Sequence, residues 1–134
     1  MIYLDSCAIV KLIAPEPESV ALAAWMNEHA DQVIITSVLA EIEVARALRR
    51  SRPGVLGAVT GVLSRIDRME IDAPVRATAA AYIDVNLRSL DAVHLATAES
   101  LVASGERLNA FVTYDKRLAS AAVEAGFTVA APGA

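Results

Sequence analysis

The chain has 134 residues, of which 55% are hydrophobic and 21% are charged. This length and apolar content are typical of one compact domain with a continuous core, so we expect a single domain over residues 1–134. The net charge of −4 argues against a protein that holds nucleic acid mainly through a global positive field. Any binding of a polyanion must therefore depend on local clusters of basic residues.

Membrane-spanning and secretory segments are not expected. The sequence has no run of about 18 uncharged apolar residues, and Asp5 follows the N-terminus too closely for the apolar core of a signal peptide. Cys7 is the only cysteine, which excludes an intramolecular disulfide and a cysteine zinc site. We expect a soluble, cytoplasmic protein in which Cys7 is a small buried apolar residue.

Strands and helices are predicted to alternate along the chain. The short apolar runs expected to be buried strands are 2–4, 33–35, 69–71, 110–113 and 127–129. The longer Ala- and Leu-rich stretches expected to be helices are 19–30, 37–50, 53–68, 74–85, 89–104 and 116–125. Ser37 and Ser89 are expected to cap helix N-termini, and Gly105 and Gly126 helix C-termini. This alternation predicts a three-layer α/β/α fold with a mostly parallel central sheet.

Four acidic residues fall near the expected carboxyl ends of the strands, where parallel sheets form their functional crevice. They are Asp5, Glu43, Asp91 and Asp115. Taken singly, each is explained by helix capping, the helix dipole or exposure to solvent. Taken together, converging carboxylates repel one another unless a positive partner lies among them. A divalent cation is such a partner, and oxygen ligands without a cysteine cluster favour Mg²⁺ or Mn²⁺ over zinc.

Four segments resemble, in order and spacing, the PIN-domain ribonucleases, and among them most closely the VapC toxins of toxin–antitoxin pairs. These segments are YLDSCA (3–8), LAEIEV (39–44), LRSLDAVHLA (87–96) and FVTYDKRL (111–118). The resemblance extends over essentially the whole chain. It implies an endoribonuclease that uses Mg²⁺ or Mn²⁺ to hydrolyse phosphodiester bonds in RNA, often tRNA or rRNA. It also implies a cognate antitoxin protein that silences the activity.

The same resemblance implies roles for individual residues. The acidic quartet of the family corresponds to Asp5, Glu43, Asp91 and Asp115. The aspartates are expected to hold metal, and Glu43 either to join them or to orient the attacking water. Ser6 matches a small hydroxyl residue after the first acid and is expected to hold Asp5 or a water on the metal. Thr113 matches a hydroxyl residue two positions before the last acid.

Glu41 competes with Glu43 for the place in the quartet. The two residues lie about 200° apart around a helix, so only one of them can face the site. Apolar residues flank both, and burial therefore does not choose between them. The spacing in the family from this glutamate to residues 46–48 favours Glu43, with Glu41 as the alternative.

Basic residues and one histidine are further candidates. His94 shares a helix face with Asp91 and is interpreted as a satisfied interior histidine, with a bond to a group behind the site as the alternative. A cluster of arginines forms either a phosphate-binding rim or a solvated helix face, and the charge pattern leaves these equally open. Its members are Arg46, Arg49, Arg50 and Arg52. Three more basic residues border the expected crevice, with the same two interpretations: Lys11, Lys116 and Arg117.

A non-enzymatic alternative is an inert PIN-like or receiver-like α/β domain that acts through protein binding. A receiver-like switch needs an acid pair in the first loop and an acceptor aspartate after the third strand. Asp72 has the second position, but Asp5 lacks an acidic neighbour. An intact quartet also argues against an inert copy.

Apolar surface is expected to lie in an interface, either of a homodimer or of a complex with the antitoxin. The mean hydropathy of +0.44 is high for a small soluble domain, so some apolar side chains should remain uncovered in the monomer. The candidate segments are 55–63 and the group formed by Leu12, Ile13 and Trp25.

Overall fold

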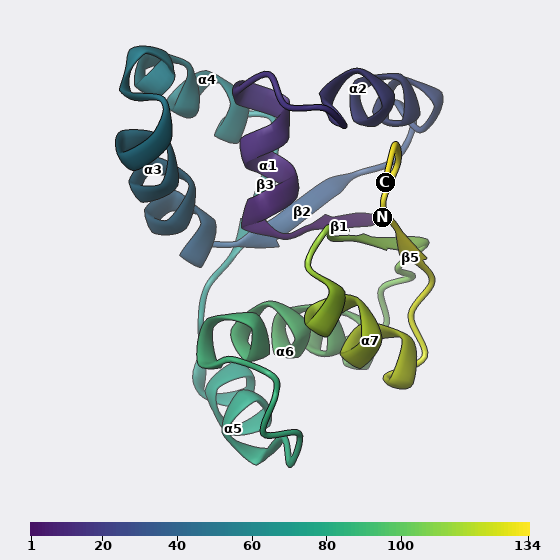
Figure 1. The fold of residues 1–134 in the computed structure, drawn as a ribbon. Coiled ribbons are helices and arrows are strands. Elements are labelled where there is room, and N and C mark those ends of the chain that lie inside the picture. The colour runs from purple at the N-terminus through teal and green to yellow at the C-terminus, as the bar shows by residue number, and fades with distance from the viewer.

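The computed structural model describes residues 1–134 and contains a five-stranded sheet in which every pair of neighbours is parallel (Figure 1). The strands are β1 (Ile2–Leu4), β2 (Ile34–Ser37), β3 (Asp67–Met69), β4 (Ala110–Val112) and β5 (Val129–Ala130). Their order across the sheet is β3-β2-β1-β4-β5. Strands β2 and β3 are therefore added on one side of β1, and β4 and β5 on its other side. This reversal creates a switch point between β1 and β4, where open α/β sheets bind their ligands.

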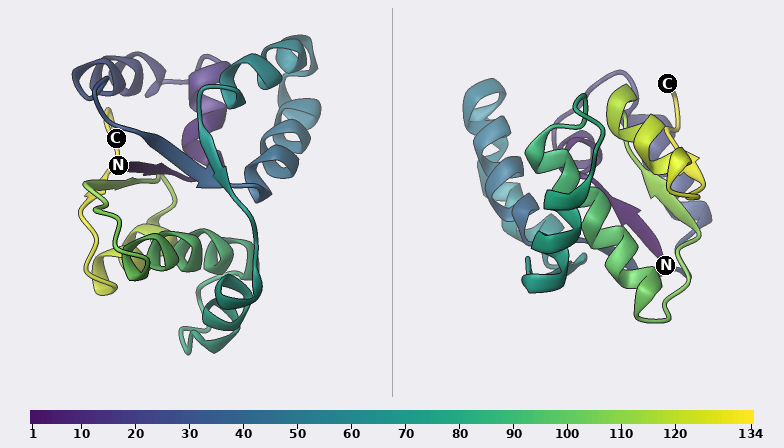
Figure 2. Two further views of the ribbon diagram at one scale, coloured as in Figure 1. Left: turned by 180° about the vertical axis from the view of Figure 1, so that it is seen from behind. Right: turned by 90° about the horizontal axis from the view of Figure 1, so that it is seen from below.

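Helices cover both faces of the sheet, which confirms the predicted α/β/α fold (Figure 1 and Figure 2). One layer contains α1 (Ser6–Ile13), α2 (Ser19–Glu28), α3 (Leu39–Ser51), the 3-10 helix η1 (Pro53–Ala58) and α4 (Val59–Leu63). The other contains α5 (Ala73–Ala81), α6 (Ser89–Ala103) and α7 (Lys116–Glu124). None of these helices is both long and apolar enough to cross a membrane.

The core consists of two apolar clusters, one on each face of the sheet. Strand β1 contributes side chains to both clusters, because successive side chains of a strand point to opposite faces. Ile2 and Leu4 belong to the cluster beneath α1 to α4. Tyr3 belongs to the cluster beneath α6 and α7, where its ring stacks on Phe111 at 5.0 Å between centroids. A strand covered on both faces therefore appears as a continuous apolar run.

Helix α1 was not predicted. Its eight residues follow directly on β1, and the segment lacks the Ala- and Leu-rich length by which the other helices were recognised. Asp5 begins the helix because its side chain accepts a hydrogen bond from the backbone N–H of Ala8 at 2.8 Å, the usual N-cap interaction. The helix turns the chain back over the sheet within one residue of the strand.

The expected single helix over residues 53–68 was wrong. The structure has η1, then the five-residue α4, and then β3, which begins at Asp67. Three glycines lower the helical preference of this stretch: Gly54, Gly57 and Gly61. Strand β3 lies two residues earlier than expected because it is an edge strand with exposed Asp67 and Arg68, so it has no buried apolar run to mark it.

Helix boundaries agree with the sequence at the C-termini and only partly at the N-termini. Gly105 and Gly126 follow α6 and α7 with φ of +99° and +94°, the left-handed conformation that ends many helices. The Ser37 hydroxyl accepts a hydrogen bond from Leu39 N–H at 3.1 Å at the start of α3. Ser89 does not cap α6, because it is already the first helical residue and its side chain makes no capping bond.

The uncovered apolar side chains differ from those expected. Leu12, Ile13 and Trp25 are partly buried against the first core cluster. The most exposed large apolar residues are instead Ile83 and Val85, at 96% and 94% exposure in the loop between α5 and α6. In the other expected segment, 55–63, Val59 and Leu63 are buried and Val55, Leu56 and Val62 are partly buried.

Candidate active site

A pocket of about 260 Å³ opens at the carboxyl ends of β1 and β4. The residues that line it are Asp5, Ser6, Cys7, Glu43, Asp91, His94, Tyr114 and Asp115. The four acids singled out from the sequence come from four different places in the chain, yet they face this one space. The sheet order explains this convergence, because the segments that follow β1 and β4 meet at the switch point.

Asp5 is the most enclosed of the four acids, with 3% exposure. One carboxylate oxygen caps α1, and the other accepts a hydrogen bond from the Thr113 hydroxyl at 2.5 Å. Burial raises the pKa of Asp5 to about 6, although the bonds from Thr113 and Ala8 act in the opposite direction. Metal-free Asp5 is therefore a carboxylate held in an unfavourable environment.

Asp115 is coupled to Asp5 through the same threonine. Its backbone N–H donates to the Thr113 hydroxyl oxygen at 3.1 Å, and its carboxylate caps α7 by accepting from Leu118 N–H at 2.9 Å. Thr113 thus accepts from one aspartate and donates to the other across the switch point. Both aspartates have the helix-capping function that the sequence allowed, but capping does not explain the other two acids.

Asp91 lies in the first turn of α6, and its carboxylate is half-buried without a side-chain hydrogen bond to the protein. Its pKa is raised by partial burial and by the negative charge of Asp115, with a smaller contribution from Glu43. His94 and Arg88 act to lower this pKa, but burial and the neighbouring acids outweigh them.

Glu43 is held from two sides. Its Oε1 accepts a hydrogen bond from Ser6 at 2.7 Å and lies 2.7 Å from Nε2 of His94. Burial acts to raise the pKa of Glu43, but the bonds from His94 and Ser6 prevail and lower it below its usual value. Glu43 is therefore an ionised carboxylate that faces the pocket.

His94 is a buried histidine whose ring nitrogens both have partners, and it also contacts the site through Glu43. Both interpretations offered by the sequence therefore apply. The side chain is 2% exposed, and its Nδ1 lies 2.7 Å from the Tyr3 hydroxyl. Burial raises the pKa of Tyr3 well above its usual range, so this hydroxyl keeps its proton. We therefore assign the Tyr3 hydroxyl as the donor to Nδ1. A neutral imidazole that accepts at Nδ1 carries its proton on Nε2, and Nε2–H then donates to Glu43.

Three expectations about neighbouring residues need correction or can be sharpened. Ser6 holds Glu43 and not Asp5, whose hydroxyl partner is Thr113. Cys7 is exposed, because the residues of α1 that turn into the core are its neighbours. Glu41 lies outside the pocket and pairs with Arg68 at 3.4 Å on the surface, so Glu43 is the glutamate that faces the other acids.

The four carboxylates and the Ser6 hydroxyl that line the pocket are oxygen donors, which suit a hard cation. Both ring nitrogens of His94 are engaged by Tyr3 and Glu43. No three acidic, histidine or cysteine side chains already converge as ligands of a single ion. The acids surround the space without closing on it. The raised pKa of Asp91 reflects its partial burial first and the negative charge of Asp115 second.

The receiver-like alternative receives no support from the geometry. Asp72 follows the edge strand β3, and β2 lies between this strand and β1. Its carboxylate caps α5 by accepting from Val75 N–H at 3.0 Å and does not line the acidic pocket. The acceptor and the first-loop acid of a receiver would thus be separated by a strand.

The chain resembles known proteins over nearly its whole length. Residues 2–124 match the PIN domain family. Ribonuclease VapC35 of Mycobacterium tuberculosis is 53% identical over 133 residues, which cover 99% of this chain and 98% of the relative. Ribonuclease VapC47 of the same species is 39% identical over 137 residues, with 100% and 98% coverage. The chain belongs to the PIN-domain family and, within it, to the VapC ribonucleases, which confirms the resemblance found in its four motifs.

A solved structure shares the fold. A chain in the crystal structure of FitAcB from Neisseria gonorrhoeae superimposes with a TM-score of 0.67, covers 96% of both chains and is 20% identical. At this level of identity the likeness concerns the arrangement of helices and strands alone.

Proposed function

We propose that this protein is a divalent-metal-dependent endoribonuclease that hydrolyses phosphodiester bonds in RNA and acts as the toxin of a toxin–antitoxin pair. The observation that carries the proposal is the convergence of four carboxylates on one pocket at the switch point of the sheet. Similarity to VapC ribonucleases over nearly the whole chain supports it. The activity belongs to a single domain, residues 1–134, that functions in the cytoplasm.

The proposed ligands of one or two Mg²⁺ or Mn²⁺ ions are Asp5, Asp91 and Asp115. A cation held there would supply neutralisation of phosphate charge and would lower the pKa of a water for in-line attack on the phosphorus. Glu43 completes the ligand set or orients the attacking water.

The protein holds these groups through a supporting layer of hydrogen bonds. Thr113 and the α1 backbone fix both oxygens of Asp5, so the carboxylate has little freedom to rotate. Ser6 and His94 fix Glu43 in its ionised form. Such outer bonds orient metal ligands and raise their affinity.

The substrate and partners follow from the family and from charge. The substrate is RNA, with tRNA and rRNA as the classes that the resemblance favours. The cognate antitoxin silences the enzyme, and a pocket with several negative charges is a natural target for an arginine or lysine of such an inhibitor. The protein assembles as a homodimer or as a toxin–antitoxin hetero-oligomer.

The test is RNA cleavage by the purified protein in Mg²⁺, in Mn²⁺ and in chelator, with product ends mapped by sequencing. We expect defined cleavage sites with either ion and none in chelator. Asp5→Asn should remain folded by circular dichroism and lose cleavage. Cleavage at the same sites and rate by Asp5→Asn, or by the wild type in chelator, would contradict the proposed metal-dependent activity.

A further inference from the structure

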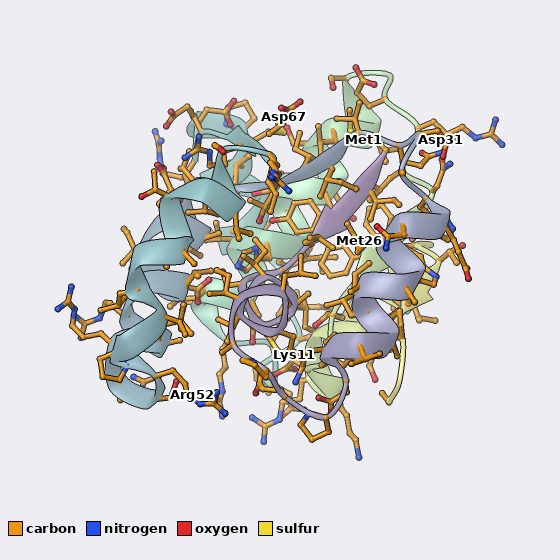
Figure 3. All side chains as sticks on the ribbon, turned by 90° about the horizontal axis from the view of Figure 1, so that it is seen from above. Met1, Lys11, Met26, Asp31, Arg52 and Asp67 are labelled. Atoms are coloured by element: carbon orange, nitrogen blue, oxygen red, sulfur yellow. The ribbon has the colours of Figure 1, made fainter.

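A second hollow adjoins the acidic pocket. It has a volume of about 620 Å³ and lies between α1 and α3, which pack side by side (Figure 3). Ser6, Cys7 and Glu43 line both spaces. The two spaces therefore adjoin, with these three residues at their common border.

One face of α3 forms a wall of this groove. The residues that line it are Leu39, Ile42, Glu43, Arg46, Ala47 and Arg50. Their spacing of three or four residues is that of a single helix face. Along this face a carboxylate at the acidic pocket is followed by Arg46 and then by Arg50, which lie about 6 Å apart along the helix axis.

The four clustered arginines separate into different environments. Arg46 and Arg50 line the groove, are exposed, and form no ion pair or hydrogen bond with the protein. Arg49 lines a different pocket, on the side of Glu41. Arg52 donates to the Pro15 carbonyl at 3.1 Å. Only the first two guanidiniums therefore have free donors beside the acidic pocket, and free guanidinium donors suit phosphate oxygens.

The rest of the groove is apolar. Val10 of α1, Ile42 of α3 and Leu90 of α6 line it, and the last two are 60% and 50% exposed. Aliphatic side chains of this kind offer contact area to the face of a nucleobase but no sequence-specific hydrogen bonds. The groove thus combines a site for phosphate with a site for a base.

We propose that this groove is an RNA subsite, in which Arg46 and Arg50 bind a backbone phosphate next to the scissile one and the apolar wall holds the flanking nucleotide. The proposal rests on the proposed function and adds the path of the substrate to it. It also explains how a chain with a net charge of −4 holds a polyanion, since the positive field is local to the site.

The test measures binding apart from cleavage. A labelled single-stranded oligoribonucleotide is titrated with Asp5→Asn protein that also carries Arg46→Gln and Arg50→Gln, over a series of salt concentrations. We expect about tenfold weaker binding and a salt slope shallower by about 1.4, the value for two lost phosphate contacts on a single strand. Arg49→Gln removes the same charge from another face of α3 and should change affinity less than about twofold.

Cleavage kinetics give the second measurement. With Asp5 intact, the double arginine variant should raise KM about tenfold and leave kcat nearly unchanged, because it removes binding that precedes the chemical step. Equal RNA affinity and salt slope for the double variant and Arg49→Gln would overturn the subsite. Unchanged RNA affinity with lost binding of the cognate antitoxin would assign the groove to a protein segment and also overturn it.

These results separate the subsite from the activity. Arginine-dependent RNA binding without cleavage by the wild type supports the subsite and contradicts the ribonuclease. Cleavage by the wild type with an unaltered KM for the double variant supports the ribonuclease and contradicts the subsite. A wild type that neither binds nor cleaves RNA contradicts both.

Discussion

Asp5 and Asp72 have the same local structure in two regions of the molecule. Each precedes a helix in extended backbone conformation and accepts a hydrogen bond from the N–H three residues ahead, at 2.8 and 3.0 Å. Asp72 follows an edge strand and is exposed. Asp5 follows the central strand at the switch point, where a threonine holds its second oxygen and three other acids share its pocket. Function therefore depends on where the sheet places a capping aspartate.

The largest expected effect comes from replacing each of these aspartates by asparagine. Asparagine is also a good N-cap residue, so both variants should keep their helices. Asp5→Asn should lower the rate of RNA cleavage by about a thousandfold or more, because it removes a charge that holds the cation. Asp72→Asn should change that rate less than about twofold. Equal losses in the two variants would mean that the helix cap alone matters.

Stability in chelator should respond to the same substitution with a defined pH dependence. The folded-state pKa of Asp5 is about 6, above the ordinary value of 3.8. The folded protein thus holds this proton more tightly than the unfolded chain does, and ionisation of Asp5 destabilises the fold as pH rises between these values. Asp5→Asn should therefore raise the free energy of unfolding by about 3 kcal/mol at pH 7.

The stabilisation by Asp5→Asn should disappear near pH 4, where folded Asp5 is already protonated. Thermal or urea melts at both pH values, with chelator present, measure it. Asp72→Asn is the control and should show no such pH-dependent gain. A gain from Asp5→Asn that is equal at pH 4 and pH 7 would contradict burial of the ionised carboxylate as its cause.

A smaller effect is expected from the hydrogen bonds that hold Glu43. Tyr3→Phe removes the donor to His94 Nδ1, so the imidazole is free to change tautomer and to stop donating to Glu43. We expect about tenfold lower activity and a need for more Mn²⁺ to reach half-maximal rate. Tyr82→Phe is a matched control, because the Tyr82 hydroxyl donates to Glu99 away from the pocket. Similar metal dependence in both variants would contradict the proposal that His94 helps metal binding by holding Glu43.

Much of the fold was predictable because its signals are local. Buried strands appear as apolar runs, long helices as Ala- and Leu-rich stretches, and Gly105 and Gly126 mark helix ends. Helix α1 was not predicted, because its eight residues directly after a strand are too few to show a clear helical pattern of apolar residues. Strand β3 was displaced because an exposed edge strand has no buried run to reveal it.

The site was predictable only in part, for a geometric reason. Sheet topology implies which strand ends meet, so the convergence of Asp5 and Asp115 follows from the order of the elements. Side-chain partners do not follow from that order. Tyr3 and His94 are separated by 91 positions in the sequence, and only the packing of α6 on the sheet brings them together. The choice of Glu43 as the partner of Ser6 likewise depends on how α1 and α3 face each other.

The most direct measurement is a calorimetric titration of the metal-free protein with Mn²⁺. The central claim is that four acids from separate parts of the chain surround one pocket that binds Mg²⁺ or Mn²⁺. We predict binding by the wild type that is weakened in Asp5→Asn, Asp91→Asn and Asp115→Asn and unchanged in Asp72→Asn. Glu43→Gln weakens it as well if Glu43 is a ligand, and leaves it unchanged if Glu43 only orients the water. A wild type that does not bind Mn²⁺, or three aspartate variants that bind it as the wild type does, would contradict the claim.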